Sequence, residues 1–322
     1  MTEKVIIGSR GSKLAQAQSH WVAGELRRFH EDVEVEIVEI KTTGDTNLGA
    51  SLSELGGKGA FTKEIEDALL LGKCDLAVHS LKDLPTELPD GLQIACTPTR
   101  EVVDDSLVYR DRIGTIDDDS DPLAYLPEGA TVGTSSLRRK AMLLASRPDL
   151  HVIEWRGNVD TRLNKLENDG PDAIVLAAAG LSRLGLIDFS TRPDRVDSRF
   201  DALALRAPGW LPAVGQGALG IEIRSDDERL IHLLAPLHDA ATFASTAAER
   251  AFLNRLGAGC QAPVAAFACV PEGSALKMTG RVLARDGSVV VEHRADGEID
   301  DPHALGTEIA ERCLENGAAE LV

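Results

Sequence analysis

Arginines follow predicted strand ends at several points along the chain. Gly133 begins a run of small hydroxyl residues that leads to Arg138 and Arg139, and residues 156–162 repeat this arrangement. Free backbone N–H groups at a helix start and neighbouring guanidinium groups both bind carboxylates or phosphates. The pattern predicts anion-binding positions on the ligand side of an open α/β sheet. The alternative is that each arginine pairs with a surface carboxylate. The arginines concerned are Arg10, Arg138, Arg139, Arg156, Arg162 and Arg183.

A carboxylate follows another predicted strand, in the segment 79–85, where Asp83 stands next to Lys82. A carboxylate held at a strand end can stabilise developing positive charge or accept hydrogen bonds from N–H donors. The alternative is a plain surface pair between the two side chains. His79 is interpreted as a core histidine rather than as a catalytic base.

Cys260 lies in a glycine-rich loop, residues 256–263, between a predicted helix and a predicted strand. Glycines let the backbone turn tightly and leave the thiol accessible, which would suit a covalent role; an inert loop cysteine is the alternative. The five cysteines fit neither a disulfide framework nor paired zinc ligands. We expect most of them to be small buried residues in a reducing compartment.

Two glycine motifs are rejected on their context. Residues 215–220 match the dinucleotide pattern, but Pro212 precedes them and the strand-like run 221–223 follows where a helix should begin. Residues 56–59 suggest a phosphate loop, but Leu52 stands where that motif needs glycine and Gly59 replaces its hydroxyl residue.

Short strands and helices alternate along the first part of the chain, which predicts α/β sheets with crossover helices. We expect strands at 5–8, 33–40, 75–78, 106–109, 131–133, 152–154 and 173–176, and helices at 13–29, 62–71, 135–145 and 159–166. Residues 79–89 and 113–121 are expected to be loops. In the tail we expect a helix at 242–256, strands at 264–270, 275–283 and 288–293, and a helix at 304–316, which suggests a small α+β domain.

The amino-acid composition argues against some classes of function. The chain has 34 basic and 52 acidic residues, a net charge of −18, which disfavours nucleic acid and anionic membranes as partners. No apolar run is long enough to span a bilayer and no secretory signal is visible, so a soluble protein is expected. With 24 Arg and 10 Lys, the acidic surface would also suit a high-salt, halophilic cytoplasm.

Seven segments in order resemble the porphobilinogen deaminase (hydroxymethylbilane synthase) family, from the first strand to the last helix. They are GSRGSKLA at 8–15, GGKGAF at 56–61, VHSLKD at 78–83, VGTSSLRR at 132–139, RGNVDTRL at 156–163, LPAVGQGA at 211–218 and GCQAPV at 259–264. The resemblance implies an α/β fold with two lobes like those of periplasmic binding proteins and a small C-terminal α+β domain. The implied domains are 1–99 with 218–235, 104–211, and 240–322.

The resemblance also implies an activity. Family members join four porphobilinogen molecules head to tail into hydroxymethylbilane, releasing ammonia at each step of this part of porphyrin and haem biosynthesis. Their primer is a dipyrromethane cofactor, bound by a thioether to a cysteine that matches Cys260. The catalytic carboxylate matches Asp83. A cytoplasmic monomer that uses no metal is expected.

The remaining site residues are likewise carried by the resemblance. Cofactor contacts would come from Ser12, Lys58, Lys82, Asp83, Thr134, Ser135, Ser136, Arg138, Arg139, Gly157 and Arg162, and substrate contacts from Arg10, Arg156 and Arg183. Two positions depart from the family pattern: Glu54 replaces a lysine that some members have, and Lys13 stands where bacterial relatives often have proline.

Two other functions are compatible with parts of the sequence. An arginine-lined two-lobed fold also suits a carboxylate-binding receptor, but such receptors are usually exported and have no use for a reactive cysteine. A cysteine hydrolase would need a histidine base near Cys260 and would carry no covalent pyrrole.

Overall fold

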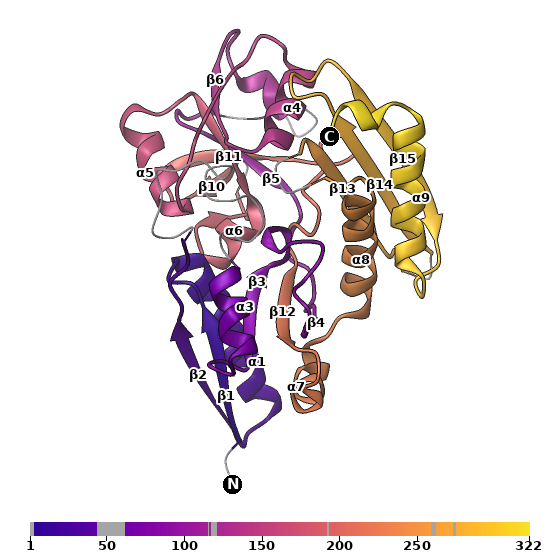
Figure 1. The fold of residues 1–322 in the computed structure, drawn as a ribbon. Coiled ribbons are helices and arrows are strands. Elements are labelled where there is room, and N and C mark those ends of the chain that lie inside the picture. Colours follow the sequence, from indigo (N-terminus) through magenta and orange to yellow (C-terminus); the bar gives the residue numbers. More distant parts are fainter. Residues whose placement is uncertain are drawn as a thin grey trace. The chain divides into compact units, whose positions relative to one another are not determined.

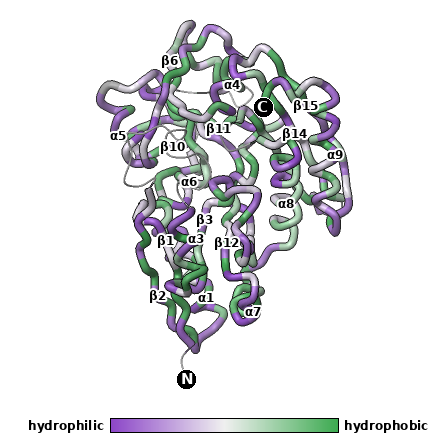
Figure 2. The backbone as a smooth tube through the Cα atoms, in the orientation of Figure 1, coloured by the Kyte–Doolittle hydropathy of each residue, from purple (hydrophilic) through white to green (hydrophobic). Residues whose placement is uncertain are grey.

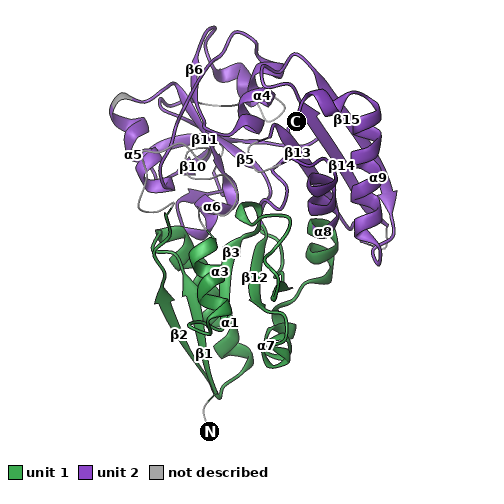
Figure 3. Cartoon of the chain, viewed as in Figure 1, with its two compact units in different colours: residues 1–101, 218–246 green, residues 102–217, 247–322 purple. Residues whose placement is uncertain are grey.

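The computed structural model describes residues 3–43, 62–114, 116, 121–191, 193–258, 262–272 and 275–322 of the chain. The chain divides into two compact units (Figure 3). The first contains residues 1–101 and 218–246, and the second contains residues 102–217 and 247–322. The expected three-domain boundaries stay a prediction.

The first unit is built on a five-stranded sheet in the order β2-β1-β3-β12-β4 (Figure 1). Its strand β1 pairs in parallel with β2 and β3, whereas β12 enters antiparallel between β3 and β4. The carboxyl ends of β1 and β3 therefore meet at one edge. The strands are β1 (Glu3–Ser9), β2 (Val33–Glu39), β3 (Leu76–Ser80), β4 (Leu92–Cys96) and β12 (Leu219–Arg224).

Helices cover this sheet through apolar faces. Val22 and Leu26 of α1 (Lys13–Phe29) pack against Val5 and Ile7 of β1 in one hydrophobic cluster. The Ser12 side chain begins the helix by accepting a hydrogen bond from the Ala15 N–H. The other helical elements are α3 (Lys63–Leu70), η1 (Leu81–Asp83), α7 (Glu228–Leu234) and η3 (Ala235–Leu237).

The second unit contains a seven-stranded sheet in the order β7-β6-β8-β5-β11-β10-β9. Parallel strands β7, β6 and β8 form one side, and antiparallel pairing begins at β5. Its strands are β5 (Asp105–Tyr109), β6 (Thr131–Gly133), β7 (His151–Ile153), β8 (Ala173–Ala177), β9 (Ile187–Asp188), β10 (Asp194–Val196) and β11 (Phe200–Leu205). Its helical elements are η2 (Pro122–Tyr125), α4 (Leu137–Ser146), α5 (Val159–Asp169) and α6 (Ala178–Arg183).

A three-stranded antiparallel sheet completes the second unit, with β13 (Val264–Cys269), β14 (Leu276–Leu283) and β15 (Val290–Gly297). Hydrophobic and hydrophilic residues alternate along α9 (Pro302–Glu315), whose Leu305 and Ile309 are buried in the cluster that includes this sheet (Figure 2). Helix α8 (Ala240–Arg255) precedes the sheet and η4 (Ala318–Glu320) follows α9. One core cluster joins Leu107 of β5 to Leu283 of β14, so the two sheets share a hydrophobic core.

The expected fold class, α/β with a small C-terminal α+β domain, is confirmed by these sheets. The expected strand after the false dinucleotide motif is β12, and Gly215 and Gly217 form a turn with φ of 70° and 85°. One prediction was wrong: His79 and Ser80 belong to β3 and not to a loop, because β3 continues its pairing with β12 to Ser80. Strands β4, β9, β10 and β11 were not predicted. The expected loop 113–121 lies only partly within the described residues.

Candidate active site

A small cavity lies at the edge of the first sheet where β1 and β3 end. Arg10 follows β1, Ser12 begins α1, and Asp83 ends η1, directly after β3. The cavity is lined by Arg10, Ser12, Leu14, Ala15, Gln18, Thr62, Val78, His79, Ser80 and Asp83. The fold thus brings together two of the predicted polar positions, Arg10 and Ser12, with the predicted catalytic carboxylate.

Hydrogen bonds hold the cavity wall in place. Gln18 Nε2 donates to Ser80 Oγ at 2.8 Å, which ties α1 to the end of β3. Gln16 Nε2 donates to the Arg10 carbonyl oxygen at 2.9 Å, which fixes the turn between β1 and α1. These contacts position Arg10 and Ser12 from a rigid strand and a rigid helix.

Asp83 is an exposed residue of this cavity. Its carboxylate makes no hydrogen bond or ion pair within the part of the chain that the structure describes. The alternative of a plain pair with Lys82 is therefore not seen. The carboxylate is available to accept N–H donors or to face positive charge in the cavity.

The hydroxyl residues after β6 in the second unit build the start of α4. Ser135 Oγ accepts a hydrogen bond from the Trp155 N–H at 3.0 Å, and Ser136 Oγ accepts one from the Arg139 N–H at 3.4 Å. Thr134 Oγ1 accepts one from the Ser136 N–H at 3.2 Å. The predicted helix start directly after a strand is confirmed.

Arg138 and Arg139 both turn toward one buried carboxylate, Asp105. The Nη2 atoms of Arg138 and Arg139 lie 2.8 Å and 2.6 Å from Asp105 Oδ2 and Oδ1. Trp210 Nε1 and Gln216 Nε2 donate to the same carboxylate at 2.8 Å and 2.9 Å. Burial alone would raise the pKa of Asp105, but the two guanidinium groups outweigh it and hold that pKa well below its ordinary value.

Few N–H groups of these two arginines remain without a hydrogen-bond partner. Arg138 Nη1 donates to the Leu211 carbonyl oxygen and Arg139 Nη1 to that of Val175. Both side chains are buried, and within the described residues the two Nε atoms have no hydrogen-bond partner. Sequence reasoning missed Asp105, whose only signal is an acidic residue directly before a buried apolar run.

The second arginine segment forms a turn before α5. Gly157 has φ of +125°, and a Cβ there would lie 3.0 Å from Thr161 Cγ2, so this position requires glycine. Arg162 Nε donates to the Gly157 carbonyl oxygen at 2.7 Å, and Arg156 Nη2 lies 3.1 Å from Glu154 Oε1. Arg183 Nη2 donates to the Gly217 carbonyl oxygen at 2.6 Å.

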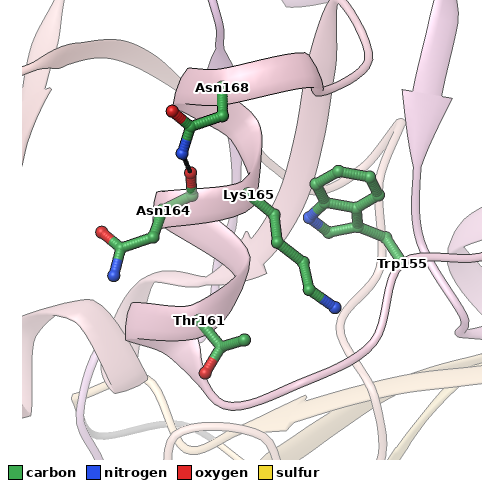
Figure 4. Close-up of a pocket in the computed structure, with 5 residues that line it drawn as sticks. All are labelled: Trp155, Thr161, Asn164, Lys165 and Asn168. Atoms are coloured by element: carbon green, nitrogen blue, oxygen red, sulfur yellow. Dashed lines mark hydrogen bonds between the residues drawn. The ribbon is translucent and has the colours of Figure 1, made fainter.

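A surface pocket lies beside this turn, against α5 (Figure 4). Trp155 is half-buried, and its Nε1 donates to the Arg162 carbonyl oxygen at 3.3 Å. Lys165 Nζ donates to the Arg156 carbonyl oxygen at 3.4 Å. The pocket is lined by Trp155, Thr161, Asn164, Lys165 and Asn168.

The predicted site residues thus fall into two groups. Arg10, Ser12, Lys82 and Asp83 belong to the first unit, and the hydroxyls and arginines after β6, β7 and β8 belong to the second. Lys58, Glu54 and Cys260 lie outside the described residues. Within the described ranges, no group of three or more His, Cys, Asp or Glu residues could hold a metal ion, and no helix is long and apolar enough to cross a membrane.

The fold and site define an α/β protein with a cavity that combines cationic and hydroxyl donors with one exposed carboxylate. A family profile described as "Porphobilinogen deaminase, dipyromethane cofactor binding domain" matches residues 5–232, and one described as "Porphobilinogen deaminase, C-terminal domain" matches residues 243–315. The chain belongs to the porphobilinogen deaminase family, and it carries that family's dipyrromethane cofactor-binding domain.

The chain is also similar to individual proteins. Proteins named porphobilinogen deaminase from Bacillus cereus (strain AH820) and Bacillus mycoides (strain KBAB4) are each 46% identical over 319 residues, covering 99% of this chain and 97% of the relative. Among solved structures, a Salmonella typhimurium periplasmic binding protein described for high arginine specificity has 12% identity and a TM-score of 0.37, covering 73% of this chain and 92% of its own. An ancestral cationic amino acid solute-binding protein has 15% identity and a TM-score of 0.43, covering 73% and 87%.

Proposed function

We propose that the chain condenses four porphobilinogen molecules head to tail into hydroxymethylbilane, with release of ammonia, as a transferase of porphyrin biosynthesis. The observation that supports this most directly is the exposed Asp83 carboxylate, which has no partner among the described residues, in a cavity whose lining also includes Arg10 and Ser12. Pyrrole rings present N–H donors, and their condensation develops positive charge next to the ring. A single free carboxylate stabilises that charge without neutralising the cations that bind the substrate's acidic side chains.

The arginines supply the matching positive charge. Each porphobilinogen carries an acetate and a propionate, and guanidinium groups bind carboxylates in a bidentate way. In a chain with a net charge of −18, cations must be concentrated where these carboxylates bind. We assign Arg10, Arg156 and Arg183 to the substrate.

The described residues fit a bound dipyrromethane, because they offer donors for its carboxylates and one acceptor for its N–H groups. We assign its binding to Ser12, Lys58, Lys82, Asp83, Thr134, Ser135, Ser136, Arg138, Arg139, Gly157 and Arg162. When bound, the group supplies the pyrrole carbon to which the first substrate is joined. The buried Nε atoms of Arg138 and Arg139 support this assignment, because a buried donor without a partner is costly unless something satisfies it.

Attachment of the cofactor through a thioether to Cys260 is supported by the state of the other cysteines. Cys74, Cys96 and Cys313 are buried, and burial raises the pKa of their thiols to about 11, about 12 and about 11. Such thiols stay protonated at neutral pH and are poor nucleophiles. Cys269 is half-buried on a strand, and we assign the thioether to Cys260.

We further propose a cytoplasmic monomer. The acidic, arginine-rich composition supports a halophilic setting, and circular dichroism tests it: secondary structure should be lost in low salt and regained in molar salt. Full folding at low salt would contradict that setting and leave the activity proposal intact.

The activity is tested by adding porphobilinogen to the purified protein and measuring ammonia and products. We expect ammonia release together with a linear product that oxidises to a coloured porphyrin. Binding of porphobilinogen without ammonia release, by protein shown to be folded and to carry its primer, would instead indicate a binding protein.

A further inference from the structure

A buried histidine–carboxylate pair lies at the cavity of the first unit. His79 Nε2 and Glu222 Oε2 are 3.1 Å apart, and the two side chains are 5% and 0% exposed. The register of β3 and β12 explains the contact. His79 lies opposite Gly220, and Glu222 is two residues further along the same face of β12, within reach of a long side chain.

A second carboxylate, Glu66 of α3, faces this pair. Glu66 is buried, and burial raises its pKa above the ordinary value; the charge of Glu222 adds to that effect, whereas Thr62 and His79 oppose it. The Oε1 atoms of Glu66 and Glu222 are buried, with no hydrogen-bond partner among the described residues. Burying these ionisable groups and leaving two of their oxygens without a hydrogen-bond partner both cost free energy. An apolar core would avoid these two costs, so we look for a role of the cluster beyond packing.

His79 connects this cluster to the cavity. It lines the cavity together with Asp83 and Arg10, and its Nε2 atom lies 3.1 Å from Glu222 Oε2. The charged groups that face His79 are therefore Glu222 from β12, Glu66 from α3, Asp83 from η1, and Arg10 after β1.

We propose that His79 is a proton-transfer group of the Asp83 cavity, with Glu222 and Glu66 as positioning residues that hold its ring and its charge. This inference rests on the proposed condensation and revises the expectation that His79 is only a core histidine. It gives the site a second functional group besides Asp83. We assign Asp83 to stabilising positive charge and His79 to moving the proton.

The reaction requires such a group. Each condensation breaks the carbon–nitrogen bond of the substrate's aminomethyl group, breaks one pyrrole carbon–hydrogen bond and forms a carbon–carbon bond. The electron pair of the carbon–hydrogen bond stays in the ring, and the released proton and ammonia leave together as ammonium. Because Glu222 holds the Nε2–H of the neutral ring, Nδ1 keeps its lone pair, accepts the proton and passes it to ammonia or to solvent.

Three variants of the full holoenzyme test the proposal. His79→Gln keeps a polar donor beside Glu222 but cannot take up a proton, and Glu222→Gln keeps the shape but removes the charge. The matched control is His30→Gln, because His30 is a partly buried histidine of the same unit whose Nε2 lies 2.8 Å from the Leu233 carbonyl oxygen. Activity is measured as kcat and KM for porphobilinogen between pH 5 and 9.

We expect His79→Gln to lower kcat about 100-fold, the size of a general acid–base contribution, with KM little changed. We expect kcat of the parent to fall at low pH and kcat of this variant not to fall, whereas Glu222→Gln should change the pH profile. His30→Gln should match the parent. A folded His79→Gln enzyme with the parent's kcat and pH profile would overturn the proposal but leave the condensing activity intact, whereas an inactive parent would count against the proposed function itself.

Nitrogen NMR of the 15N-histidine parent gives a readout that does not depend on turnover or on the folding of His79→Gln. We expect one ring that keeps the Nε2–H tautomer in the parent and changes its nitrogen chemical shifts in Glu222→Gln. The absence of any ring that responds to Glu222→Gln would overturn the proposal.

Discussion

The Nη2 atom of Arg138 lies 2.8 Å from Oδ2 of Asp105, and neither side chain is more than 4% exposed. This ion pair joins the start of α4 to the first residue of β5. Arg139 binds the other oxygen of the same carboxylate. The arrangement holds both arginines on a rigid support and pairs one Nη atom of each with the carboxylate.

Removing this support should destabilise the second unit. Asp105→Asn leaves two buried guanidinium groups without a counter-charge, and we expect it to lower the free energy of unfolding by about 3–5 kcal/mol. The matched control is Asp104→Asn, since Asp104 pairs with the largely exposed Arg206 at 2.8 Å and should cost about 1 kcal/mol or less. Urea unfolding of both variants checks this, and equal losses would show that the Asp105 cluster has no special role in stability.

Asp83 should be needed for turnover but not for folding. Asp83→Asn removes the charge of an exposed side chain without a partner in the described residues, so we expect almost complete loss of ammonia release with an unchanged melting temperature. Asp90→Asn, another exposed carboxylate of the same unit, is the control and should retain activity. Turnover by Asp83→Asn close to that of the parent would remove the assigned role.

Glu66 should make stability depend on pH. Its folded-state pKa is raised, so its contribution is fully present below its unfolded-state value of 4.5 and is lost as the pH rises through the higher folded value. Glu66→Gln should therefore gain stability relative to the parent as the pH increases from 4.5 to 7.5, as measured by urea unfolding. Asp67→Asn, an exposed position on the same helix, should show no such trend. A constant difference between Glu66→Gln and the parent across this range would contradict the assignment.

The buried thiols should resist modification. At pH 8 the native protein should not react with a thiol reagent at Cys74, Cys96 or Cys313, because their raised pKa values keep them protonated and burial excludes the reagent. After denaturation, four of the five thiols should titrate if Cys260 carries a thioether. Rapid native labelling of Cys96, found by peptide mapping, would argue against its buried position.

The sequence predicted the parts of the site that are local along the chain. The positions of Arg10, Ser12 and Asp83 after strand ends, and the start of a helix soon after the strand at 131–133, needed only short-range patterns. Asp105 and Glu222 could not be found in this way. Asp105 meets Arg138 across 33 residues, and Glu222 meets His79 across 143, so only the strand pairing brings them together.

Long-range strand pairing also explains an error in the predicted secondary structure. Strand β3 was expected to end before His79, because two prolines follow and only its pairing with β12 extends it to Ser80. Strands β9 and β10 are too short to show a periodic pattern, with two and three residues.

The most direct test of the central claim is the intact mass of the purified protein, with peptide mapping around residues 256–263. Protein made in cells that contain porphobilinogen should carry an excess equal to two linked porphobilinogen-derived units, located on the peptide with Cys260. This result would establish the covalent primer on which the proposed condensation depends. An unmodified Cys260 in folded protein from such cells would contradict it.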